Sequence, residues 1–74
     1  MDVRVDKAGE VKVMVFNMMG EQVVKLMDQT QNQGNYRVAW DGRNRKGEIV
    51  GNAVYLIVTD QPSGHKVRKV IVLK

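Results

Sequence analysis

The stretch Val11-Lys12-Val13-Met14-Val15-Phe16 has valine at every second position, and this alternation decides the fold class. Successive side chains of a β-strand face opposite ways, so the three valines share one face and the other three residues share the second. Just upstream, residues 3–6 alternate as well, and residues 7–10 have the composition of a turn. We therefore expect a β-hairpin that spans residues 3–16.

Turn residues divide the following part of the chain into short segments. Asn17 and Gly20 bound a turn, since both residue types tolerate positive φ. Residues 21–28 are compatible with a short helix and with a bulged strand, because Val23 and Leu26 are three residues apart. The shortness of the segment and the turns on either side favour the strand.

The second half of the chain also has the pattern of strands. Tyr36–Trp40 alternates with large residues on one face, residues 49–50 form a short apolar piece, and Ala53–Thr59 is apolar on both faces, as a central strand is. Residues 60–64 hold the only proline and predict a hairpin loop. The last strand is expected from about Lys66 to Lys74, with a bulge at Arg68-Lys69. Six or seven short strands predict a single all-β domain, an antiparallel sandwich or barrel, over residues 1–74.

Length and composition limit the possible chemistry. The chain has 74 residues, no cysteine and a single histidine, His65. Disulfide scaffolds, zinc fingers and cysteine nucleophiles are thereby excluded, and the chain is too short for a large catalytic cleft. Fourteen valines outnumber leucine, isoleucine and alanine together, which is a β composition. We expect a non-enzymatic domain without cofactor or metal, stabilised by packing alone.

Charge and hydropathy say little about location or partner. No apolar run approaches the ~18 residues of a membrane span, and the first six residues do not resemble a signal peptide. The net charge is +4, which permits attraction to anionic partners. If the domain acts outside the cytoplasm, the export signal belongs to a longer parent chain.

Several short motifs, taken in order, resemble a known family. They are residues 34–42, which end in Trp40-Asp41-Gly42, then Asn44, Gly47, Val50, Val54-Tyr55, and the closing segment from Arg68 to Lys74. Upstream, residues 11–23 are similar to the family segment Val-x-Val-x-Asp-x-x-Gly-x-x-Val. Together these motifs resemble the Ig-like domain of the flagellar hook-capping protein and related C-terminal modules of secreted bacterial proteins.

The resemblance implies an Ig-like sandwich of about seven strands at the C-terminus of a larger exported protein. It implies an accessory module located outside the cell or on its surface. Its expected partners are proteins: a neighbouring domain of the parent chain, another copy, or the secretion machinery. A sorting domain for type nine secretion is the alternative, and the two differ in whether a fused, exported reporter leaves the periplasm. Two departures are Asn17 for the usual aspartate and Ala53 for the usual glycine.

The motif residues have structural interpretations of their own. We expect Trp40 to fill the sandwich core, with its indole N–H bonded to a backbone acceptor and Tyr55 packed against it or against Tyr36. Asp41 is expected to accept hydrogen bonds from backbone N–H groups further along, while Gly42 and Gly47 supply turn angles.

The polar loop residues and the methionines of the first turn are candidates for binding a cation, a nucleic acid, a carbohydrate or a protein. A cation loop built from Asp41, Asn44 and Glu48 is opposed by the basic residues between them. A carbohydrate- or nucleic-acid-binding module is a further alternative. Arg43, Arg45 and Lys46 form a basic loop cluster, but strand positions for the aromatic residues do not favour nucleic-acid binding. Carbohydrate binding depends on whether Trp40 and Tyr36 are open to solvent. A possible protein-contact surface comprises Met18, Met19, Arg43, Arg45 and Lys46.

Overall fold

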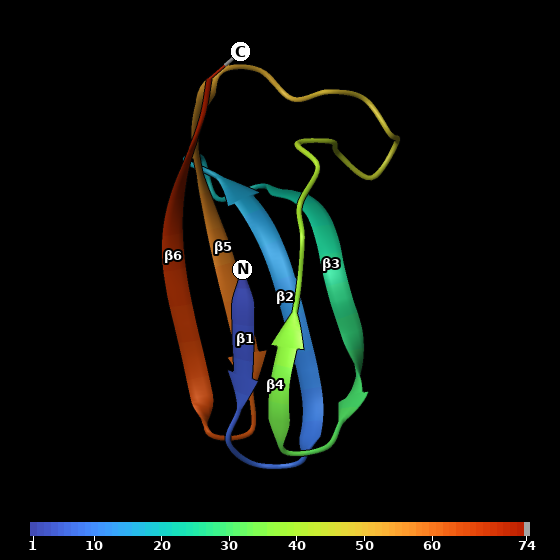
Figure 1. The fold of residues 1–74 in the computed structure, drawn as a ribbon. Coiled ribbons are helices and arrows are strands. Elements are labelled where there is room, and N and C mark those ends of the chain that lie inside the picture. The colour runs from blue at the N-terminus through green and yellow to red at the C-terminus, as the bar shows by residue number, and fades with distance from the viewer. Residues whose placement is uncertain (74) are drawn as a thin grey trace.

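Six β-strands make up the regular structure of the computed structural model, which describes residues 1–73. They are β1 (Asp2–Val5), β2 (Gly9–Asn17), β3 (Gln22–Gln31), β4 (Gly34–Arg37), β5 (Ala53–Gln61) and β6 (Gly64–Val72), and no helix forms among the described residues. One antiparallel sheet has the order β3-β2-β5-β6 and the other pairs β1 with β4. Figure 1 shows the small sheet lying across one face of the large one, which confirms the all-β antiparallel sandwich.

The core lies between the two sheets and consists mainly of valine. Val11, Val13 and Val15 of β2 are fully buried, and Val3 and Val5 of β1 belong to the same cluster. The other buried members are Val38, Val50, Tyr55 and Ile57. Because β-branched side chains pack well on a pleated surface, valines can supply most of this core.

The hairpin predicted for residues 3–16 does not form. β1 pairs with β4, with Val3 opposite Tyr36, whereas β2 pairs with β3 and β5. In a hairpin, the β1 valines would lie beside those of β2 in one layer and leave that layer uncovered. In opposite sheets the two sets of valines bury one another, so the gain in buried apolar area favours the crossover.

The uncertain segment after the first turn is the strand β3, as favoured. The β2–β3 register shifts between Val13 and Met14 and again between Val15 and Phe16. These bulges turn consecutive residues toward the core, and Val23, Val24, Leu26 and Met27 all pack against it. The bulges therefore account for the spacing that resembles a helix.

The connection between β4 and β5 contains fewer strand residues than expected. The predicted strand Tyr36–Trp40 ends at Arg37, and residues 49–50 form only an isolated bridge, Arg43 to Ile49. The structure therefore has six strands. Trp40 is half-buried in this connection and packs at the edge of the core instead of filling its centre.

β5 and β6 form a regular hairpin with a two-residue turn, Pro62-Ser63. Their register runs without interruption from Ala53 opposite Val72 to Gln61 opposite Gly64. The bulge predicted at Arg68-Lys69 is therefore wrong. β6 is an edge strand whose first six residues are exposed, so a polar pair there needs no bulge to keep apolar side chains inside. Lys74 lies outside the described residues.

Candidate functional site

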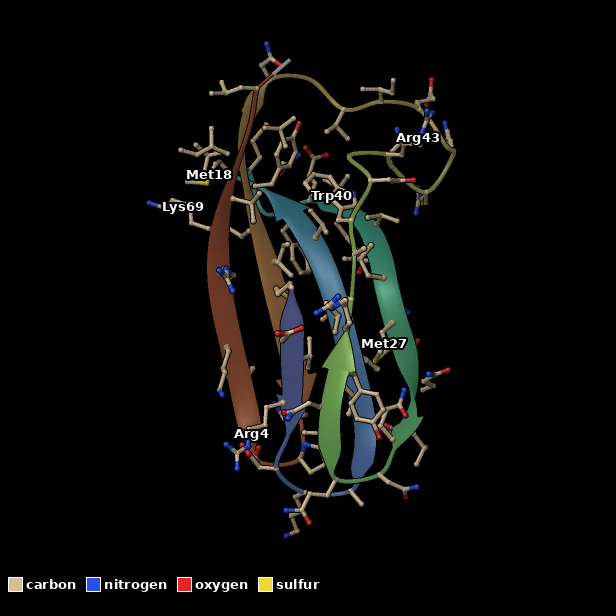
Figure 2. The ribbon with its side chains drawn as sticks, in the orientation of Figure 1. Arg4, Met18, Met27, Trp40, Arg43 and Lys69 are labelled. Carbon is tan, nitrogen blue, oxygen red and sulfur yellow. The ribbon has the colours of Figure 1, made fainter. Side chains whose placement is uncertain are left out.

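Trp40 and Tyr55 form an aromatic pair at one end of the sandwich. Their ring centroids are 5.3 Å apart at an interplanar angle of 67°, an edge-to-face contact. The indole N–H of Trp40 donates to the carbonyl of Arg43 at 2.9 Å, and the Tyr55 hydroxyl donates to the carbonyl of Gly51 at 2.9 Å. The predicted backbone acceptor and the predicted Trp40–Tyr55 contact are confirmed. Both side chains anchor the β4–β5 connection through these hydrogen bonds, and Figure 2 shows Trp40 at this end of the sandwich.

The polar part of the same motif organises the loop itself. Asp41 Oδ1 accepts a hydrogen bond from the backbone N–H of Arg43 at 3.1 Å, as predicted. Arg43 Nη1 donates to the carbonyl of Gly47 at 2.8 Å, so its guanidinium holds the loop together. Gly42 and Gly47 have φ of 78° and 83°, the left-handed conformation that glycine adopts without strain.

Two turns at this end have the same construction. They are residues 17–21 and 44–48, and each reads Asn-x-x-Gly-Glu. In the first turn, Asn17 Oδ1 accepts from the backbone N–H groups of Met19 and Glu21, both at 2.9 Å. This bonding confirms the turn predicted between Asn17 and Gly20.

The second turn repeats these hydrogen bonds one for one. Asn44 Oδ1 accepts from the N–H groups of Lys46 at 2.9 Å and Glu48 at 3.0 Å. The asparagine amide of each turn also donates to the glutamate of the same turn. The sequence predicted turn residues in both segments, but not that the two turns share one structure. The shared sequence pattern Asn-x-x-Gly-Glu could have predicted that likeness.

A cavity of about 510 Å³ lies between the two turns, with Val50 and Tyr55 among its lining residues. The oxygens of a cation loop are already engaged there, because Asn44 Oδ1 holds two N–H groups and Asp41 Oδ1 holds one. Within residues 1–73, no three His, Asp or Glu side chains gather as metal ligands would.

The predicted contact residues are exposed but divide into two groups. Met18 and Met19 are 63% and 84% exposed at the tip of the first turn, and Arg45 and Lys46 occupy the tip of the second. Figure 2 shows Met18 and Arg43 on opposite sides of this end of the molecule. They do not form one continuous patch.

A larger apolar surface, which sequence reasoning missed, covers the outer face of the four-stranded sheet. Cross-strand neighbours on this face include Met14 opposite Val58, Phe16 opposite Leu56, and Val54 opposite Ile71. Val67 and Ile71 are 59% and 63% exposed. The apolar residues of the outer face are Met14, Phe16, Val54, Leu56, Val58, Val67 and Ile71, none of which belongs to the core cluster, and Lys69 lies among them opposite Leu56.

The small sheet covers only the opposite, inner face, so the outer face has no second layer within residues 1–73 (Figure 1). The signal for this surface was present in the apolar residues Met14 and Phe16 between the valines of β2. The alternation assigned these two residues to the second face of the strand, but did not identify that face as an apolar surface.

Charges of both signs border the outer face. Lys12 lies opposite Asp28 on β3 and opposite Asp60 on β5. Lys25 Nζ donates to Asp28 Oδ2 at 2.8 Å. This hydrogen bond and the positive charges of Lys25 and Lys12 lower the pKa of Asp28 below its ordinary value. Asp28 is therefore ionised at neutral pH, beside the two lysines.

Comparison with known proteins finds no matching family model, no matching curated protein and no matching solved structure. Among the described residues, there is also no helix with the length and apolar character to cross a membrane. Functional inference therefore depends on the surfaces of the domain itself.

Proposed function

We propose that this chain is a non-catalytic Ig-like interaction module of a larger exported bacterial protein, and that it acts through the outer face of its four-stranded sheet. The observation that carries the proposal is the uncovered row of apolar side chains on β2, β5 and β6. Monomeric domains rarely expose continuous apolar patches of more than a few hundred Å², and larger patches mark interaction sites.

The family resemblance supports the same interpretation. Trp40, Asp41, Gly42, Gly47 and Tyr55 all shape or anchor the β4–β5 connection, which is a structural role that an accessory module requires. At the departure from the family pattern, Ala53 opens β5 with a negative φ, so the missing glycine causes no backbone strain. The resemblance also supports a location outside the cell or on its surface.

The occupant proposed for the outer face is a second copy of the same face. The molecule measures 35 × 20 × 18 Å, so a broad face is of the size that a stable interface needs, roughly 800 Å² per partner. Two sheets pack face to face when apolar side chains interdigitate between them. The mixed border also allows Lys12 or Lys25 of one copy to approach Asp60 of the other.

The test is the association state of the isolated domain. Sedimentation equilibrium over a range of concentrations should show a monomer–dimer equilibrium. Leu56→Lys places a second positive charge on the outer face, opposite Phe16 and beside Lys69, and should shift the protein to monomer because two like charges would then be buried together in the dimer.

Ile49→Lys is the matched control. Ile49 is 59% exposed but lies in the β4–β5 connection, away from the outer face. It should associate as the unmodified domain does, and circular dichroism should show both variants folded. A domain that stays monomeric at all concentrations, or equal effects of the two substitutions, would contradict self-association through this face.

A further inference from the structure

A second open surface lies on the inner side of the sandwich, between β1 and β6. It is a groove of about 410 Å³, whose walls include Val3, Ile57, Thr59, Lys66 and Arg68. The groove exists because the small sheet has two strands and the large sheet has four. In Figure 1, β1 and β4 lie over the middle of the large sheet, and on the inner side of β6 the side chains of Lys66 and Arg68 are exposed, whereas Val70 and Val72 pack against the core.

The edge of β1 that faces this groove has free hydrogen-bonding capacity. Met1 and Val38 exchange both backbone hydrogen bonds, at 2.9 and 2.8 Å. In an antiparallel ladder the bonded pairs alternate, so Val3 and Val5 also bond to β4, whereas the backbone N–H and C=O groups of Asp2 and Arg4 point away from it. β1 pairs with no other strand, which leaves an open strand edge along the groove.

Gln61 already occupies one end of that edge as a neighbouring strand would. Its buried side-chain amide donates from Nε2 to the carbonyl of Arg4 at 3.1 Å. Its Oε1 accepts from the N–H of Asp6 at 3.3 Å. The remaining edge groups are the N–H and C=O of Asp2 and the N–H of Arg4, so the edge can accept further pairing toward Met1.

The wall opposite β1 is basic. Lys66 lies opposite Thr59 and Arg68 opposite Ile57, so both lie on the core-facing side of β6. Neither makes an ion pair within residues 1–73, whereas Arg4 is paired with Asp6 and Asp2 with Arg37. A ligand in the groove would therefore meet two uncompensated positive charges two residues apart on one strand face.

We propose that this groove binds an extended acidic peptide by strand addition to β1. The peptide backbone pairs with Asp2 and Arg4, and alternate side chains face Lys66 and Arg68. Strand addition supplies affinity through the main chain, while the wall beneath alternate side chains supplies selectivity. Carboxylates at every second position match the spacing of the two cations, because side chains two residues apart share a face.

This inference concerns the face of β6 opposite the outer face, so it can fail without affecting self-association, and the reverse is also true. The probe is a fluorescein-labelled peptide, Thr-Glu-Thr-Glu-Thr-Glu-Thr. Its reference is the same peptide with lysine in place of glutamate. Anisotropy titration at low salt should show binding of the acidic peptide only, and hydrogen exchange should show new protection of the Arg4 amide.

Two pairs of variants separate the parts of the site. Lys66→Glu combined with Arg68→Glu should weaken binding about tenfold or more, since like charges then face each other. Lys69→Glu changes charge on the other face of β6, opposite Leu56, and should leave the affinity unchanged. Arg4→Pro removes the edge N–H at a position where an edge strand tolerates proline, and Arg4→Ala retains that N–H while it removes the same charge.

Loss of binding in Arg4→Pro but not in Arg4→Ala is expected from strand addition, provided that thermal melting shows both variants folded. Equal binding by both, or equal losses in Lys69→Glu and the double variant, would overturn the proposal in favour of general charge attraction. Tighter binding of a single-stranded oligonucleotide in the same groove would also overturn it.

Discussion

Asparagine holds two turns of this domain by the same local chemistry. The side-chain oxygens of Asn17 and Asn44 each accept two backbone N–H groups and so replace hydrogen bonds that the chain cannot make for itself in a tight turn. The glycine three residues later takes the left-handed conformation. These are short-range effects, and for that reason the sequence predicted both turns.

Removal of one of these side chains should weaken the domain measurably. Asn44→Ala leaves the N–H groups of Lys46 and Glu48 without their acceptor, and should lower the free energy of unfolding by about 1 kcal/mol, since the turn is exposed to water. Asn44→Asp retains the acceptor oxygen and should stay within a few tenths of a kcal/mol. Urea denaturation of both variants measures the difference. If Asn44→Asp loses as much stability as Asn44→Ala, the hydrogen bond from the Asn44 amide to Glu48 contributes more than the two that its oxygen accepts.

At the scale of elements, the sequence predicted strands better than it predicted their partners. Alternation identified β2 and a continuous apolar run identified β5, because both patterns are properties of a single strand. Pairing depends on which residues face each other across the core. For that reason β1 was assigned to β2, although it pairs with β4. The groove was missed for the same reason, since Gln61 and Arg4 lie 57 residues apart in the chain.

The first residue of β2 lies very close to the turn between β5 and β6. Gly9 has φ of 153°, and a Cβ built on it would lie 2.5 Å from Cγ of Pro62 in the β5–β6 turn. Gly9→Ala should therefore cost about 1–3 kcal/mol of unfolding free energy, as overpacking of a tight contact does. Thermal or urea denaturation provides the measurement.

Two further variants test whether this contact is the cause. Gly51→Ala should change stability by no more than about 0.5 kcal/mol, because Gly51 has no atom within 4 Å of an added Cβ and no positive φ. Pro62→Ala removes Cγ, so the double variant with Gly9→Ala should regain part of the loss. Additive losses in the double variant would attribute the effect to backbone conformation alone.

For the whole molecule, the sequence predicted the layered fold and the source of its stability, but placed the centre of the core at the wrong residue. Trp40 is the largest side chain, and size suggested a central position. Trp40 lies three residues beyond the end of β4, past the small sheet, so its indole packs against the edge of the core. The outer face was not predicted, because an apolar residue in a strand indicates burial without saying what covers it.

A thin valine core should make the domain sensitive to small deletions. Domains of this length without disulfide or metal have only ~3–5 kcal/mol of stability from their core. Val13 is fully buried at the centre of β2, and Val13→Ala should remove about 2 kcal/mol, the transfer free energy of the lost methyl groups together with the cavity left behind. Val67→Ala deletes the same atoms at a site that is 59% exposed and should cost less than about 0.5 kcal/mol. Urea unfolding at a concentration low enough to keep the protein monomeric compares the two. Equal losses would mean that the outer face contributes as much to the unfolding free energy of the monomer as the core does. That result would contradict the assignment of the core to the space between the two sheets.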